Sequence, residues 1–491
     1  MKSKFSKVLS ILLSVVLVIS SFYLLYQVIR LNVLPSKFLF PLTIGVVVLD
    51  AIFILLLIYF SKNVVSKIVC IVLTLFICVA SCMGGYYISK TQNVLSNITN
   101  VAKHAKNTVS VIVKESSSIK NKSQLNDVSV GSLRLNEQGS KKVLKELSGE
   151  GIVLNQTEYD SMTALLEAFY NGEVDSIIIN ESSRSQILDM EAYSNFDSNT
   201  RVVYQTSYKV KNNDSATSVS DITSKPFNVL ISGSDTRGGF DENGRSDVIM
   251  IATVNPKTHT ILLTSVQRDF YVTTACDAGD GCMQGALDKI THTGIHGTNT
   301  TKRTVEQLLG IEINYTFKVG FDTVTELVDV LGGVDVYVEP GYATTTSEFS
   351  VHEGVNHLNA QQALAFARER YSYTEGDRQR TKNQQQVLMG IVKEATKPSV
   401  ITNYAAIMDT MANTFSTTMS NEEITDLIKY QLNNNPTWKM EQYMVDGTGD
   451  TLMCAELGDA ASVMVPDQST VKMAKDKIKA VLAGKSSEDV K

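Results

Sequence analysis

Three apolar runs near the N-terminus constrain the architecture of this chain more than any other feature. They cover residues 8–29, 38–60 and 68–88, and each is long enough to cross a bilayer as a helix. A cleaved signal peptide is the alternative for the first run, but no small-residue cleavage site follows it and two more runs do. We therefore predict a three-helix membrane anchor over residues 1–90, in a multi-pass membrane protein.

Basic residues around these runs predict the orientation of the anchor. Lysines precede the first run and lie between the second and third, at Lys2, Lys4, Lys7, Lys62 and Lys67. The first connection carries only Arg30 and Lys37. Because cytoplasmic loops are enriched in Lys and Arg, we expect a cytoplasmic N-terminus and an extracellular C-terminal part. Asp50 lies within the second run, where a carboxylate is costly, so we expect it to bond to a neighbouring helix.

The remainder of the chain has the pattern of two α/β domains. Short β-rich runs alternate with helical patterns to about residue 215, and a Ser-, Asn- and Asp-rich segment at 212–225 has linker composition. Beyond it, β-branched runs at 227–232, 248–254 and 260–266 read as buried strands. We predict an extracellular accessory domain with its linker at 91–220. A larger three-layer α/β/α domain with a central mixed sheet follows at 225–485.

One predicted helix carries charges on the face that should point into the core. Advancing 100° per residue from Arg380 gives a stripe less than about 90° wide. Its members are Asp377, Arg380, Gln384, Val387 and Ile391. Arg378 falls on the opposite, solvent-facing side. Because unpaired charge is costly to bury, the stripe predicts that an anionic group meets it.

Further charged residues follow or precede predicted strands, at 233–237, 244–247 and 268–269. Any one of them alone reads as a turn or cap residue, but strand ends are also where α/β folds place ligand chemistry. Arginine forks match phosphate oxygens, and an Asp pair can hold Mg²⁺. The combination predicts phosphoryl transfer, which depends on positioning and electrostatic stabilisation.

Other chemistries fit the sequence less well. There is no Walker-type loop for a nucleotide, no G-x-G-x-x-G after a strand and no G-x-S-x-G elbow. His292 and His296 have H-x₃-H spacing, but nearby glycines oppose a regular helix, so turn or surface histidines are the better reading. The net charge of −6 argues against nucleic acid as a partner. Cys276 and Cys282 either form a disulfide around a Gly-rich loop or remain two free thiols.

Six motifs occur in order along the large domain. They are Gly233-Ser-Asp-Thr-Arg237, Arg245-Ser-Asp-Val-Ile-Met-Ile-Ala-Thr-Val-Asn-Pro256, Ser265-Val-Gln-Arg-Asp269, Asp288-Lys-Ile-Thr-His-Thr-Gly294, Ala367-Arg-Glu-Arg370, and Gly376-Asp377 with Arg380 and Gln384. At these residues the chain resembles the LytR-CpsA-Psr (LCP) family. It is most similar to the streptococcal capsule-type members, which have three membrane helices and an accessory domain. One departure is Asn383, where many relatives carry an arginine.

The resemblance implies a phosphotransferase that moves a glycan 1-phosphate from a polyprenyl-pyrophosphate carrier to a peptidoglycan hydroxyl. The glycan would be a capsular polysaccharide or a related anionic wall polymer. By motif match, Asp235 and Asp247 would hold Mg²⁺ (or Mn²⁺), and one of them would help to activate the acceptor. The catalytic and pyrophosphate-binding residues would further comprise Arg237, Arg245, Arg268, Lys289, Arg368, Arg370, Asp377, Arg380 and Gln384. An apolar tunnel beneath the sheet would take the prenyl chain.

Two other functions compete with this interpretation. One is a membrane-bound transcriptional attenuator or sensor of envelope state, which would need an effector surface in the cytoplasm. Only short segments lie on that side, and none is a DNA-binding module. The other is a polyprenyl-pyrophosphate phosphatase, in which water replaces the sugar hydroxyl. Expected partners are the lipid-linked glycan, peptidoglycan and the membrane, with capsule-export and kinase proteins as further candidates.

Overall fold

The computed structural model describes residues 2–60, 63–101, 104–211, 214–234, 242–277, 281–397, 406–407, 410 and 415–491. The chain divides into two compact units. Unit 1 comprises Met1–Asn97, Ala395–Ala412 and Ser420–Pro436, and unit 2 comprises Ile98–Glu394, Asn413–Met419 and Thr437–Lys491. Each unit is described by itself below.

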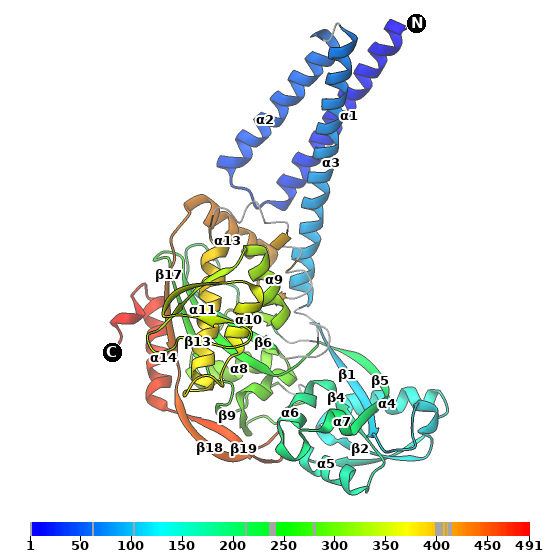
Figure 1. The fold of residues 1–491 in the computed structure, drawn as a ribbon, viewed down its shortest axis with the longest axis vertical. Helices are drawn as coiled ribbons and strands as arrows, with labels where there is room; N and C mark the ends of the chain where they lie inside the picture. Colours follow the sequence, from blue (N-terminus) through cyan, green and yellow to red (C-terminus); the bar gives the residue numbers. More distant parts are fainter. Residues whose placement is uncertain are drawn as a thin grey trace. The chain divides into compact units, whose positions relative to one another are not determined.

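Unit 1 contains the three apolar helices (Figure 1). Its elements are α1 (Lys2–Leu31), α2 (Ser36–Leu55), the π-helical η1 (Leu56–Phe60), α3 (Val64–Val101, which runs into unit 2) and α13 (Asn421–Asn434). Three segments are long and apolar enough to cross a membrane, namely Lys7–Leu31, Ser36–Phe60 and Val64–Val94, which indicates membrane association. The Ser21 hydroxyl of α1 donates to Asp50 Oδ1 of α2 at 2.9 Å. This is the interhelical bond expected for a carboxyl within an apolar span.

Residues 104–211 of unit 2 form a five-stranded mixed sheet, which we call the accessory domain. Its strand order is β3-β2-β4-β1-β5. Its elements are β1 (His104–Lys114), η2 (Lys122–Gln124), β2 (Val128–Leu133), η3 (Arg134–Asn136), α4 (Glu137–Gly149), β3 (Leu154–Tyr159), α5 (Met162–Asn171), β4 (Ser176–Asn180), η4 (Glu181–Ser183), α6 (Arg184–Asp189), η5 (Glu191–Tyr193), α7 (Phe196–Asn199) and β5 (Thr200–Lys211). On β1, Val109 and Val111 pack into the core beneath α4, whereas Ile112 packs into the core beneath α5. Alternating apolar side chains thus bury both faces of the sheet.

The large domain is built on a six-stranded sheet of order β16-β11-β6-β7-β8-β17. Its first elements are β6 (Phe227–Ser234), β7 (Ser246–Asn255), β8 (Thr260–Val266), β9 (Tyr271–Thr273), β10 (Leu287–Lys289), η6 (Ile290–His296), α8 (Thr298–Leu309), β11 (Tyr315–Gly320) and α9 (Phe321–Leu331). Strands β6, β7 and β8 are antiparallel neighbours, while β11 is parallel to β6 and β17 is parallel to β8. The predicted central mixed sheet is therefore confirmed.

The rest of the large domain completes the helical layers and adds three small ribbons. Its elements are β12 (Val334–Val338), β13 (Thr344–Thr345), β14 (Ser350–Val351), β15 (Gly354–Leu358), α10 (Ala360–Arg368), α11 (Asp377–Ala395), β16 (Phe415–Thr417), β17 (Lys439–Met444), β18 (Gly447–Cys454), β19 (Asp459–Pro466), α14 (Gln468–Leu482) and η7 (Ser487–Asp489). Residues 334–338 form β12, which pairs with β15 in a separate ribbon outside the central sheet.

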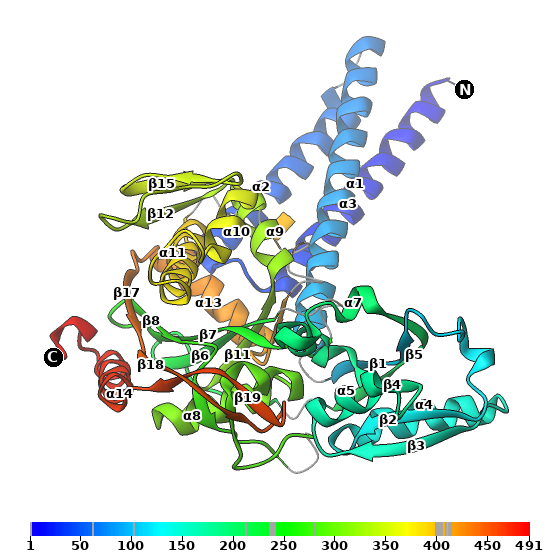
Figure 2. The same ribbon diagram turned by 60° about the horizontal axis from the view of Figure 1, so that its bottom comes forward.

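Helices cover both faces of the central sheet, with α10 and α11 on one side and α8 and α14 on the other (Figure 2). Strand β7 shows how the sequence produces these layers. Ile249 and Ile251 belong to the core with α8 and α14. Val248 and Met250 point to the opposite face and line a cavity beneath α10 and α11. A nearly continuous apolar run is required here because both faces of the strand are buried.

Candidate anion site and apolar cavity

Helix α11 places charged and apolar residues of the predicted stripe along one side. Gln384, Val387 and Ile391 line the same cavity. One turn before Gln384, the Arg380 side chain is only 12 % exposed and pairs with Asp377 at the start of the helix. Arg378 is 41 % exposed and pairs with Asp446 at 2.6 Å. The polar end of the stripe is thus buried with its charges, and the off-stripe arginine lies at the surface.

Arg268 and Asp247 form the centre of a cluster of charged side chains, which we call the charged group. Its other described members are Arg245, Asp269, Lys289, Arg370, Asp377 and Arg380. Arg268 follows β8, and its Nη1 donates to Asp247 Oδ1 of β7 at 3.0 Å. Each side chain is 14 % exposed. The Thr291 hydroxyl donates to the same carboxylate oxygen at 3.3 Å. Antiparallel pairing of β7 with β8 brings these two positions together, although they are far apart in the sequence.

Arg245 joins this centre from the segment before β7. Its Nη2 lies 3.9 Å from Asp247 Oδ2, and its Nη1 forms an ion pair with Asp189 at the end of α6 in the accessory domain. The Arg245 side chain is 9 % exposed, whereas that of Asp189 is 60 % exposed. The accessory domain therefore supplies a charge partner directly to the candidate site.

A second carboxylate, Asp269, links Lys289 to the centre. Lys289 Nζ donates to Asp269 Oδ1 at 3.3 Å, and Arg268 Nε lies 3.7 Å from Asp269 Oδ2. Asp269 follows Arg268 in the sequence motif, yet sequence reasoning assigned it no role. Its position opposite Lys289 depends on the pairing of β9 with β10, which the sequence does not reveal.

The charges of this group shift one another's pKa values. Burial by itself would raise the pKa of Asp247, but the guanidinium groups of Arg268, Arg245 and Arg380 outweigh it and hold this pKa below its usual value. Burial opposes the charge on Arg268, yet Asp247, Asp269 and Asp377 raise its pKa overall. For Arg380, burial is the largest effect and lowers the pKa, with Arg268 and Arg370 adding repulsion.

Two buried donors in the group lack hydrogen-bond partners. The Nε atoms of Arg268 and Arg380 are inaccessible to solvent and bond to no described residue. Buried polar groups are normally satisfied, and an orphaned donor costs about 1–3 kcal/mol. With Arg370 included and Asp189 also counted, the described part of the group holds five basic residues (Arg245, Arg268, Lys289, Arg370 and Arg380) and four acidic ones (Asp189, Asp247, Asp269 and Asp377). An anion that accepted hydrogen bonds from both guanidinium groups would relieve these costs.

The remaining arginines predicted for the site lie around the end of α10. Arg368 is the last residue of that helix and is exposed. Arg370 is partly buried, and its charge is close enough to Arg380 to lower the pKa of that group. The Arg370 guanidinium also lies over the Tyr371 ring, 4.7 Å from the ring centre. Arg370 therefore belongs to the charged group, whereas Arg368 is an exposed residue at the end of α10.

Asp235 and Arg237, two other predicted site residues, lie outside the described residues. The metal expectation can therefore be tested only on Asp247. Its lowered pKa keeps it ionised, and a carboxylate with a hydroxyl beside it suits Mg²⁺, which binds one or two carboxylates and otherwise phosphate oxygens and water. Within the described parts of the chain, no three His, Cys, Asp or Glu side chains are grouped to hold a metal by themselves.

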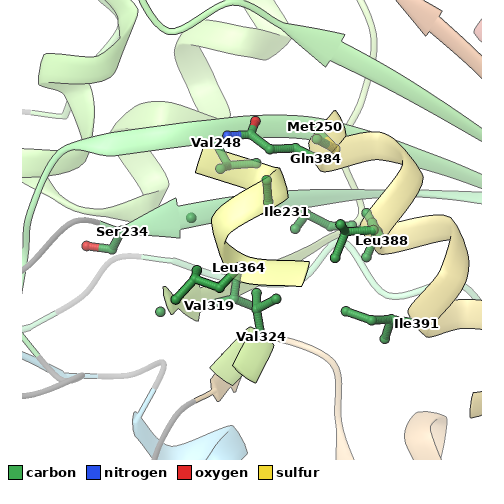
Figure 3. Close-up of a pocket in the computed structure, with 14 residues that line it drawn as sticks. Ile231, Ser234, Val248, Met250, Val319, Val324, Leu364, Gln384, Leu388 and Ile391 are labelled. Carbon is green, nitrogen blue, oxygen red and sulfur yellow. The ribbon is translucent and has the colours of Figure 1, made fainter. Parts of the chain in front are cut away.

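An apolar cavity begins next to the charged group, between the sheet and helices α9 to α11 (Figure 3). Val248, which follows Asp247, lines it, and so does Gln384, one turn beyond Arg380. Leu364, Leu388 and Ile391 supply apolar walls farther along. Its volume is about 80 Å³, below the range typical of ligand pockets. A long apolar ligand would therefore enter only by displacing side chains such as Leu388.

Asn383 is part of the core of the large domain. It is 1 % exposed, its Nδ2 donates to the Phe366 carbonyl at 3.1 Å, and its Oδ1 accepts from Gln379 Nε2 at 3.0 Å. The Phe366 carbonyl lies in the last turn of α10, where carbonyl groups lack helical partners. Asn383 thus ties α11 to the end of α10.

The two histidines expected at a turn or on the surface are mostly buried. Both lie on η6, and His292 Nδ1 is 2.7 Å from Asp288 Oδ1. His296 Nε2 is 3.0 Å from Glu456 Oε2. The surface prediction was wrong because these side chains acquire carboxylate partners from the fold.

Cys276 and Cys282 are joined in a disulfide.

Comparison with known proteins places the chain in a family. The model of the LytR_cpsA_psr family matches residues 192–480. A Bacillus cereus protein named polyisoprenyl-teichoic acid–peptidoglycan teichoic acid transferase TagU is 30 % identical over 241 residues, 48 % of this chain and 76 % of that protein. The protein of the same name from Bacillus subtilis is 34 % identical over 203 residues, 41 % of this chain and 63 % of that protein.

Among solved structures, protein gbs0355 from Streptococcus agalactiae is 25 % identical with a TM-score of 0.46, covering 53 % of this chain and 88 % of that one. The crystal structure of Bacillus subtilis TagU is 28 % identical with a TM-score of 0.40, covering 52 % and 97 %. The family model spans more than half of the sequence, and the chain therefore belongs to the LytR_cpsA_psr family.

Proposed function

We propose that this chain is a phosphotransferase that moves a glycan 1-phosphate from a polyprenyl-pyrophosphate carrier to a hydroxyl of peptidoglycan. The observation that carries the proposal is that the charged group, called the cationic group from here on, lies next to the apolar cavity beneath α10 and α11. Asp247 and Val248 are consecutive, and Arg380 and Gln384 are one helical turn apart, so the two regions meet on β7 and again on α11. A polyprenyl pyrophosphate has a matching arrangement, because its anionic head is joined directly to a long apolar chain.

The arginines would supply most of the catalytic effect. The acceptor oxygen attacks the phosphorus that carries the glycan, and the bond from this phosphorus to the bridging oxygen breaks. Polyprenyl phosphate leaves, and the proton of the acceptor hydroxyl passes through solvent to the departing phosphate. Charge grows on the phosphate oxygens and on the leaving group. Arg268 and Arg380, whose Nε atoms lack hydrogen-bond partners among the described residues, would stabilise that charge from fixed positions.

Asp247 suits binding and orientation better than proton transfer. Its lowered pKa makes it a weak base at neutral pH. If Mg²⁺ or Mn²⁺ takes part, Asp247 would be one ligand, and Asp235 is the second candidate from the sequence motif. A bound metal ion would neutralise charge on the pyrophosphate. Lys289, held by Asp269, would hold one further phosphate oxygen.

The names of the relatives support transfer of a wall polymer, since both are called teichoic acid transferases acting on peptidoglycan. We propose that the polymer here is a capsular polysaccharide or a related anionic polymer. We also propose that the chain spans the membrane three times and that unit 2 is extracellular. The lysines before the first span and between the second and third support this orientation. Peptidoglycan and the lipid-linked glycan would then lie on the same side as the site.

Replacement of single arginines in cells that depend on this chain tests the proposal. Arg268→Ala and Arg380→Ala should lower the amount of polymer attached to the wall by at least about 10²-fold and release polymer into the medium, because one fixed donor to a developing oxyanion is worth that much. Arg378→Ala is the matched control, because Arg378 lies two residues from Arg380 but pairs at the surface with Asp446. Unchanged attachment in both test variants would refute the proposal. Hydrolysis of the carrier without transfer would instead indicate a phosphatase.

A further inference from the structure

A second cavity, of about 380 Å³, lies between the accessory domain and the large domain. This volume is within the usual range for small-ligand sites. Its walls are rich in side-chain amides, with one phenol among them, contributed by both domains: Asn107, Asn136, Asn180, Tyr208, Asn243 and Asn299. None of these residues belongs to the cationic group described above.

Contacts between the two domains hold the walls of this cavity in place. Glu242 of the large domain accepts a hydrogen bond from Thr108 and forms an ion pair with Lys106 at 3.0 Å. On another side, the Thr163 backbone N–H and hydroxyl both donate to the Leu457 carbonyl, at 3.1 and 3.0 Å. The cavity is thus enclosed by two domains that are bonded to each other.

Asn136 is the clearest sign that the cavity binds something. It is 7 % exposed, and both its Nδ2 and its Oδ1 lack a hydrogen-bond partner among the described residues. It occupies the N-cap position of α4 without using its side chain to cap the helix. The Oδ1 atoms of Asn107 and Asn180 in the same walls are buried and unpartnered as well. These atoms are not accessible from the cavity as the side chains stand, so the amides would have to turn toward a ligand, which would then satisfy donors and acceptors that are otherwise costly to bury.

The chemistry of these walls selects an uncharged, hydroxyl-rich ligand. One amide presents a donor and an acceptor side by side, which matches two adjacent hydroxyl groups of a sugar ring. An anion is disfavoured, because the only Arg or Lys among the described lining residues is Arg134, which pairs with Asp160 at 2.9 Å. Glu137 and Glu456 add negative charge. A peptide bound by strand addition is disfavoured, because that mode relies on main-chain groups at a strand edge, whereas the polar groups gathered in these walls are side-chain amides.

We propose that the cavity between the accessory and large domains is a saccharide-binding site, distinct from the cationic site. Its ligand would be a sugar unit of either the peptidoglycan strand or the polymer to be transferred, since both carry neighbouring hydroxyl groups. Asn243, which lines the cavity, lies two residues from Arg245 in the cationic group. A glycan held here would therefore lie near that group. The choice of these two ligands rests on the proposed function, but binding itself requires no phosphoryl transfer, so a failure to bind saccharide and a failure to transfer polymer can be told apart.

Binding to the full-length protein in detergent or nanodiscs, measured by titration calorimetry, tests this inference. Three soluble probes distinguish the possible ligands. A chito-oligosaccharide represents the peptidoglycan strand, a dephosphorylated oligosaccharide repeat represents the wall polymer, and a stem peptide represents the peptide part of peptidoglycan. We expect at least one saccharide to bind saturably. Asn136→Ala should weaken that binding by on the order of tenfold, the effect of about one or two lost hydrogen bonds.

Two more variants make the result decisive. Gln138→Ala removes an exposed amide of the same wall without touching the core, and it should weaken binding severalfold even if Asn136→Ala does not fold. Asn195→Ala is the matched control, because Asn195 is also an N-cap residue of the accessory domain with no side-chain cap bond but lies outside the cavity. Saccharide binding that is absent, or that survives Asn136→Ala and Gln138→Ala in folded protein, would overturn the inference. Binding of the stem peptide alone would also overturn it.

Discussion

Asp189 of the accessory domain forms an ion pair with Arg245, a residue of the cationic group in the large domain. Arg245 is thereby shared between Asp189 and Asp247, and the charge available to a ligand depends on both. The sequence offers no signal for this pair, because 56 residues separate its members. The accessory domain is consequently an electrostatic component of the candidate site.

Removing the Asp189 charge should strengthen anion binding. In Asp189→Asn the amide oxygen still accepts a bond from Arg245, but the negative charge that competes with phosphate is gone. We expect the dissociation constant for a prenyl pyrophosphate to fall by about two- to fivefold, since a partly exposed ion pair is worth up to about 1 kcal/mol. Equilibrium binding at low and high salt measures this effect, which salt should reduce. Asp197→Asn, which breaks the Arg184 pair elsewhere in the accessory domain, is the control. Weaker binding in Asp189→Asn would show that the charge positions Arg245 instead.

Asp247 should contribute stability that depends on pH. Its folded-state pKa is lowered from the usual 3.8 because three guanidinium groups outweigh its burial. Such a group stabilises the fold above its unfolded pKa, and the contribution is lost as the pH falls through the folded pKa. We expect Asp247→Asn to lower the free energy of unfolding by about 1–3 kcal/mol at neutral pH, the range for a charge-assisted bond. The difference from the unmodified protein should shrink below about pH 4. Thermal melts from pH 3 to 7 would reveal it, and a difference independent of pH would contradict the assignment.

Asn383 should matter for stability through its buried bonds. Asn383→Ala leaves the Phe366 carbonyl and the Gln379 amide without a partner in the core, at a cost of about 1–3 kcal/mol. Gln386→Ala on the same helix removes two exposed bonds, one to Gln442 and one from the Tyr337 backbone N–H, and should cost less than about 0.5 kcal/mol. Denaturant unfolding of the two variants in parallel provides the measurement. Equal losses would mean that Asn383 contributes no more than a surface amide.

The apolar cavity should bind the lipid tail and leave recognition of the head to the arginines. Leu388→Trp fills the cavity from α11, so we expect about tenfold weaker binding of a long-chain prenyl pyrophosphate and unchanged binding of inorganic pyrophosphate. Leu388→Met nearly conserves the volume and should bind both ligands normally. Competition binding with the two ligands distinguishes a loss of affinity for the lipid tail from a loss of affinity for the pyrophosphate head. A loss of both in a folded Leu388→Trp protein would place the head, not the tail, in this cavity.

Local sequence patterns determined the elements of this protein and much of their order. The three apolar runs became α1, α2 with η1, and α3, which are long and apolar enough to cross a membrane, and a helix satisfies the backbone groups of such a run internally. The β-branched runs became β6, β7 and β8, because strands covered on both faces require continuous apolar residues. The period of 3.6 residues placed Gln384, Val387 and Ile391 along one wall of a cavity.

Tertiary structure alone decided which charges meet. Asp269 faces Lys289 and Asp189 faces Arg245 because strand pairing and domain packing bring together segments that have no pattern in common. The uncharged bond from Asn383 to the Phe366 carbonyl likewise depends on the packing of α11 against α10. The amide-lined cavity has the same origin, since its walls come from two domains and no single motif contains them. Periodicity reports the environment of one element, whereas ion pairs and cavities depend on the distances between elements, which only the folded chain fixes.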